Sequence, residues 1–127
     1  MTYFEDLTAY SYSHFPRHDT WLVNIGWVDV NHPFPHGGVD PSIVEKIRKL
    51  CKAPVNQTRG LHKCPMCSQF PIWELISGET VTLGSAEIHV PGKGVTYACP
   101  TLIYHYIAKH GYLLPEEFLE TVRRTIL

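Results

Sequence analysis

The sequence predicts an α+β fold, a small antiparallel sheet with about three helices packed on it. Apolar residues at every second position mark short strands, and apolar residues three and four positions apart mark longer helical segments. The strands in the middle of the chain follow one another through short loops, which favours antiparallel pairing. The chain has 127 residues, of which 44% are hydrophobic. That is enough for one core, so we expect a single domain over residues 1–127.

Five segments are predicted to form strands. In residues 21–28 the side chains of Trp21, Val23, Ile25 and Trp27 fall on one face. Further strands are expected at residues 72–76, 81–83, 87–90 and 95–98. The last two flank a four-residue loop of Pro, Gly and Lys, and this arrangement is typical of a hairpin.

Three helices are predicted from their end signals. Asp40 is placed to cap a helix that begins at Pro41 and ends before Pro54. Its buried stripe is expected to be Ile43, Val44, Ile47, Leu50 and Cys51.

The other two helices lie near the end of the chain. Pro100 is expected to open one that runs to about Lys109, with Gly111 as its stop. Pro115 opens the last, and acidic residues follow it at the positive end of the helix dipole.

Charge and hydropathy argue against two classes of partner. The chain has 11 basic and 12 acidic residues, so it lacks the cationic excess of nucleic-acid-binding proteins and no nucleic-acid partner is expected. No apolar run approaches the roughly 18 residues of a membrane span, so no membrane partner is expected. The acidic first residues lack the pattern of a secretion signal. We therefore expect a cytoplasmic protein, in which the four cysteines are thiols or metal ligands.

The strongest local signal is a Cys-Pro-x-Cys turn. Cys64 and Cys67 have the spacing that lets two sulfur atoms face one ion, and Pro65 presets the turn. His62 lies two residues before Cys64, and in an extended approach it projects to the same side. Sulfur and imidazole ligands favour zinc. A redox dithiol and a chance occurrence are the other readings of a Cys-x-x-Cys pair.

A fourth ligand must come from another part of the chain. His105, in the middle of a predicted helix, is the first candidate, and Cys99, at a strand-to-helix junction, is the second. His89 and His110 are further candidates, although His110 lies among polar neighbours and is otherwise expected to be solvated. The predicted metal ligands are thus His62, Cys64, Cys67 and His105.

Several strings of the chain resemble a family of small uncharacterised bacterial proteins. They include the segments at residues 24–29, 32–35, 55–67, 84–88 and 100–107. The resemblance implies a stand-alone domain and carries no functional residues. The Cys-Pro-x-Cys turn also resembles the zinc knuckles of ribbon proteins, but those have Gly where this chain has Ser68, and they have a second such turn. The resemblance therefore extends to the turn and not to the ribbon fold.

The leading functional hypothesis is a structural zinc site in a module that binds another protein, through exposed loops at residues 29–39 and 55–61. A zinc-dependent enzyme is the alternative, with an open metal position and His32, Asp29 or Glu87 as the base. A third possibility is a metal-free binding protein of the inhibitor or immunity type, in which Cys64 and Cys67 are incidental thiols.

Overall fold

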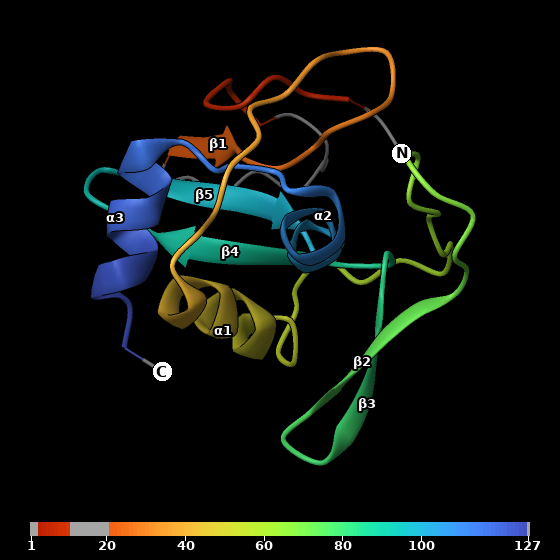
Figure 1. Cartoon of the computed structure of the whole chain (residues 1–127). Coiled ribbons are helices and arrows are strands. Elements are labelled where there is room, and N and C mark those ends of the chain that lie inside the picture. The colour runs from red at the N-terminus through yellow and green to blue at the C-terminus, as the bar shows by residue number, and fades with distance from the viewer. Residues whose placement is uncertain (1–2, 11–20, 127) are drawn as a thin grey trace.

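A computed structural model describes residues 3–10 and 21–126 of the chain (Figure 1). The α+β class is confirmed. The elements in order are β1 (Trp21–Asn24), α1 (Pro41–Leu50), β2 (Ile72–Ile76), β3 (Glu79–Leu83), β4 (Glu87–Pro91), β5 (Val95–Pro100), α2 (Ile103–His110) and α3 (Glu116–Arg124). Among the described residues, no helix combines the length and the apolar character needed to cross a membrane.

The strands form two separate sheets. One has the order β1-β5-β4, and the other is the β2–β3 hairpin. β4 and β5 pair antiparallel, as expected, but β1 pairs with β5 in parallel, with Val23 opposite Tyr97. The three-stranded sheet is therefore mixed rather than antiparallel throughout. Two parallel neighbouring strands need a long crossover connection. In the sequence, the connection from β1 to β5 contains α1 and the β2–β3 hairpin.

β1 ends at Asn24, four residues before the predicted end of the strand. The reason is Gly26, whose φ of +82° is in the left-handed region. A Cβ atom at Gly26 would lie 2.8 Å from the side chain of Ile103, so only glycine fits against α2 here. The residues beyond the strand still reach the core, because Trp27 is 2% exposed and its ring N–H donates to the carbonyl of Ala98.

The predicted helix-end signals are largely confirmed. The Asp40 carboxylate accepts from the backbone N–H of Ser42 at 2.9 Å, and Pro41 is the first residue of α1. α2 begins at Ile103 rather than at Pro100, because β5 continues to Pro100, which pairs with Glu87. Gly111 caps α2 with a φ of 68°. Pro115 directly precedes α3.

The three helices lie together on one side of the three-stranded sheet (Figure 1), with α1 in contact with both α2 and α3. The core between these layers is aromatic in part: the Tyr97 ring of β5 packs edge-on against Phe118 of α3, with centroids 5.2 Å apart. Cys51 is fully buried, as predicted for a small core residue. Four residues of α2 are buried in this core, and the C-terminal end of the helix faces the loop that carries the Cys-Pro-x-Cys turn.

Candidate metal centre

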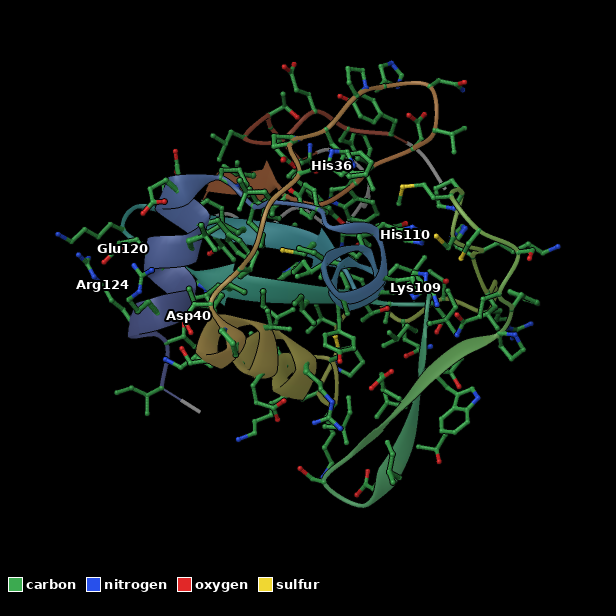
Figure 2. All side chains as sticks on the ribbon, in the orientation of Figure 1. His36, Asp40, Lys109, His110, Glu120 and Arg124 are labelled. Atoms are coloured by element: carbon green, nitrogen blue, oxygen red, sulfur yellow. The ribbon has the colours of Figure 1, made fainter. Side chains whose placement is uncertain are left out.

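Two segments that are far apart in the sequence meet at the candidate site. Cys64 and Cys67 flank a turn at residues 65–66, in the loop that leads from α1 to β2. His105 and His110 belong to α2. Figure 2 shows His110 at the end of this helix, on the side that faces the cysteine loop. The four side chains offer one ligand atom each, and these atoms all lie within 4.8 Å of one another.

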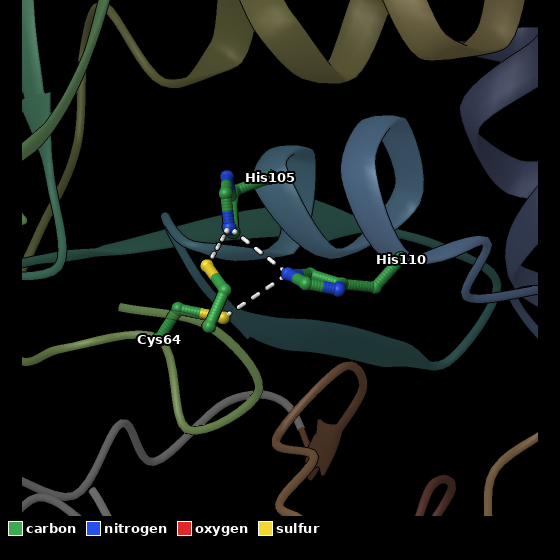
Figure 3. Close-up of side chains that lie close together, drawn as sticks. Cys64, His105 and His110 are labelled. Carbon is green, nitrogen blue, oxygen red and sulfur yellow. Dashed lines mark hydrogen bonds between the residues drawn. The ribbon is translucent and has the colours of Figure 1, made fainter. Parts of the chain in front are cut away.

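The separations between ligand atoms are short (Figure 3). Cys64 Sγ lies 3.4 Å from His110 Nε2, and Cys67 Sγ lies 3.5 Å from His105 Nε2. The two Nε2 atoms are 3.2 Å apart. Around a tetrahedral ion with metal–sulfur bonds of about 2.3 Å and metal–nitrogen bonds of about 2.0–2.1 Å, the corresponding separations would be roughly 3.5 and 3.3 Å. The cluster therefore has the dimensions of a tetrahedral S₂N₂ site and could hold a metal ion.

The site is largely shielded from solvent. Cys64 is 3% exposed and His105 is 6% exposed, while Cys67 and His110 are half-buried. The backbone N–H of Met66 donates to Cys64 Sγ at 3.4 Å, which is the amide contact that stabilises a thiolate. All four cysteines of the chain are free thiols, so both sulfur atoms of the turn are available as ligands.

Burial sets the electrostatics of the cluster. It lowers the pKa of His105, with further lowering from His110 and Lys109, and it lowers the pKa of His110, with further lowering from Lys109. Both imidazoles therefore favour the neutral form, which is the form that binds metals. Burial raises the pKa of the Cys64 thiol. Metal binding at this site would accordingly displace thiol protons.

Three of the four predicted ligands, Cys64, Cys67 and His105, lie in the cluster, and His62 does not. The backbone N–H of His62 instead donates to the carbonyl of Gly84 at 2.9 Å. A Cβ atom at Gly84 would lie 2.6 Å from the His62 carbonyl oxygen, so the two backbones are in close contact. This contact fixes His62 beside the β3–β4 connection, where its side chain lines a small pocket with Glu87.

Cys99, the second candidate for the fourth ligand, also lies outside the cluster. It belongs to β5 and is fully buried in the core, where burial raises the pKa of its thiol. The fourth member of the cluster is His110, one of the further candidates for the fourth ligand, which its polar neighbours otherwise predict to be solvated.

The spacing of the four residues carries a signal for His110. Cys-x₂-Cys followed by His-x₄-His falls within the ligand spacing of structural zinc sites. Residues five apart on a helix are rotated by about 140° from each other, so a helical-face argument does not pair His105 with His110. Their rings meet because both reach toward the loop, with centroids 5.0 Å apart.

The residues considered as catalytic bases lie elsewhere. His32 Nδ1 and Asp29 Oδ1 are 2.7 Å apart in the exposed loop after β1. Glu87 is 4% exposed, and its carboxylate accepts from Tyr10 Oη and contacts His89 Nε2, each at 2.9 Å. None of these side chains belongs to the Cys/His cluster.

Comparison with known protein families places the chain in one of them. A family model described as a domain of unknown function, DUF7919, matches residues 2–123. The chain belongs to this family. No curated protein and no solved structure matches it. The DUF7919 description names no activity, so the functional argument for this DUF7919 chain rests on the chemistry of its own residues.

We expect the His110→Ala variant to lose metal affinity and the His62→Ala variant to keep it. Removing an outer-shell partner of a metal ligand typically costs about 10–100-fold in affinity, so losing a ligand should cost more than about 100-fold. The measurement is a titration with Co²⁺, whose visible absorption reports tetrahedral coordination. Equal metal affinity of the two variants, or a larger loss of affinity in His62→Ala, would contradict a site in which His110 is a ligand and His62 is not.

Proposed function

We propose that this DUF7919 chain is a zinc-binding module in which the metal is structural. The observation that carries the proposal is the convergence of two sulfur and two nitrogen ligand atoms within 4.8 Å of one another, with three of the pairs separated by 3.2–3.5 Å. These separations match the edges of a tetrahedron around one ion. Hydrogen bonds alone would not require four such atoms to share a centre.

The chemistry of the donor set favours zinc. Zinc takes thiolate and imidazole ligands in a tetrahedral arrangement, and Cys₂His₂ is one of its common structural sets. Magnesium, calcium and manganese prefer oxygen ligands, and no carboxylate belongs to the cluster formed by the described residues. The free state of all four cysteines fits a reducing compartment such as the cytoplasm.

The number of protein ligands favours a structural role. Catalytic zinc sites use three protein ligands and leave a fourth position for water or substrate, whereas structural sites are closed by four. Cys64, Cys67, His105 and His110 would fill all four positions. The ion would then tie the loop before β2 to α2, and the described residues of these two segments share no backbone hydrogen bond.

Removing the metal should destabilise the fold. An ion present at 100–1,000 times its dissociation constant contributes about 3–4 kcal/mol to the folded state. For a domain of this size that corresponds to a fall in Tm of roughly 10 °C or more when a strong chelator strips the protein. The measurement is thermal unfolding of the full chain before and after chelation, with Zn²⁺ and Mg²⁺ added back separately.

Zn²⁺ should restore the original Tm and Mg²⁺ should not. Unchanged Tm and unchanged thiol reactivity after chelation would instead support a metal-free binding protein. A bound metal whose removal leaves Tm unchanged, with metal retained in both His105→Ala and His110→Ala, would support the enzyme with an open metal position.

We further propose that the module binds another protein. The support is a group of apolar side chains that follows the cysteine turn directly: Phe70, Trp73 and Leu75 are 46%, 55% and 55% exposed. Trp73 and Leu75 lie opposite Thr82 and Thr80 on the outward face of the β2–β3 hairpin, which projects from the body of the molecule (Figure 1). The metal would hold the base of this hairpin in place.

Site-specific photo-crosslinking tests the partner proposal. A photoreactive amino acid at position 73 should give a discrete adduct in extract of the source cells, and one at Glu116, exposed on α3, should not. Chelation should abolish the adduct, because it releases the base of the hairpin. Identical products from both positions, or an adduct that persists without metal, would contradict the proposal.

A further inference from the structure

A second candidate site lies away from the metal centre. The N-terminal segment, the loop after β1 and the connection between α2 and α3 line a half-open cavity of about 390 Å³. The first two of these segments run side by side above the sheet in Figure 1. The volume is at the small end of the range for small-molecule sites. The cavity shares no residue with the Cys/His cluster.

The walls of the cavity are apolar and aromatic. Tyr3 and Phe34 supply the rings, and most of the remaining lining residues are prolines and leucines. Both rings are held by neighbours outside the cavity. Tyr3 stacks on His32 with centroids 3.8 Å apart and planes at 7°, and Phe34 stacks on His36 at 4.4 Å. Each ring is therefore supported by a stacked histidine.

One carboxylate of the cavity is held in a defined orientation. Asp6 Oδ1 accepts from the backbone N–H of Gly26 at 2.9 Å, and Asp6 Oδ2 accepts from Tyr112 Oη at 2.6 Å. Asp6 is half-buried, and burial is the main cause that raises its pKa. A second carboxylate, that of Glu5, is exposed at the rim.

This carboxylate pair has no cationic partner in the cavity. Asp6 and Glu5 form no ion pair with any residue that the structure describes, and no Lys, Arg or His is among the lining residues. The half-buried Asp6 carboxylate has lost part of its water, and a carboxylate in such a position is stabilised by hydrogen bonds and by a nearby cation. An ammonium group can meet this requirement, and aromatic faces attract cations as well.

We propose that the cavity binds a small organic cation, a primary amine joined to an aromatic or branched apolar body. The ammonium group would lie between the carboxylates of Asp6 and Glu5, and the apolar body would pack between the rings of Tyr3 and Phe34. The observations that carry this proposal are separate from those of the zinc proposal, because the cavity lining and the metal ligands are different residues.

Three probes of similar shape and different charge test the proposal: 2-phenylethylamine, 2-phenylethanol and 3-phenylpropionate. Calorimetric titration of the full, metal-loaded chain should show that the amine binds at least about 10-fold more tightly than the alcohol, because a hydrogen bond to a charged group is worth more than a neutral one. The carboxylate probe should not bind. Nα-acetyl-lysine amide serves as a fourth probe, because it presents the same ammonium group as a protein side chain would.

Two variants locate the charge requirement. Asp6→Asn keeps an oxygen acceptor for Gly26 and should reduce the amine-to-alcohol preference to near one, and Glu5→Gln should reduce it in part. Glu79→Gln, at the exposed end of the hairpin, is the matched control and should leave the preference unchanged. If Asp6→Asn does not fold, the probe series on the unaltered chain and the Glu5→Gln variant still test whether the cavity prefers the amine.

Chemical-shift mapping gives the location independently of any variant. Amine-induced shifts should centre on residues 3–6, 33–35 and 113–115. Equal binding of amine and alcohol, absence of amine binding, or shifts centred elsewhere would overturn the proposal. Tighter binding of the lysine derivative than of 2-phenylethylamine would also overturn it, in favour of a lysine side chain of a protein partner.

Discussion

The constraint on which the site depends is the meeting of four ligand atoms from two distant segments. Cys67 and His105 are separated by 37 residues (68 to 104), and that interval contains the hairpin and both β4 and β5. The cluster would therefore hold the two ends of this long segment together. A loop of that length is entropically costly to close, and a shared ion can stabilise the closed arrangement more than any single hydrogen bond between the two segments.

The C-terminal end of α2 links the metal centre to the aromatic cavity. His110 is the last residue of the helix, Gly111 caps it, and Tyr112 follows with its backbone N–H donating to the carbonyl of Tyr106. Tyr112 is fully buried, and its hydroxyl donates to Asp6. The residue that orients the cavity carboxylate is thus two positions from a candidate metal ligand. Both sites depend on the same helix end being held in place.

Much of the local structure could be predicted because it depends on local sequence. Asp40, Pro41 and Gly111 mark helix ends through their own backbone and capping preferences, and these positions are confirmed. The end of β1 at Asn24 and the parallel pairing of β1 with β5 depend on contacts with residues some 70 positions away. No local pattern in residues 21–28 reports such contacts.

Some residues of the candidate site could likewise be predicted from local sequence, and others depend on tertiary contacts. Cys64 and Cys67 are signalled by their spacing alone, and His105 by its position in a helix. His62 was expected to join them because it is a neighbour in the sequence, but the hydrogen bond to Gly84 turns the backbone away. His110, the last residue of α2, takes its place in the cluster, and only the tertiary structure brings this helix end to the cysteine loop. The Cys-x₂-Cys and His-x₄-His spacings together indicate all four residues of the cluster, whereas proximity to the cysteines in the sequence indicates His62.

X-ray absorption spectroscopy at the zinc edge reports the atoms bound to the ion, and so it measures the ligand set of the site. In the zinc-loaded full chain we expect two sulfur atoms at about 2.3 Å and two nitrogen atoms at about 2.0–2.1 Å from the metal. A shell with fewer than two sulfur atoms, or one completed by a water oxygen in place of an imidazole, would contradict a closed site formed by Cys64, Cys67, His105 and His110.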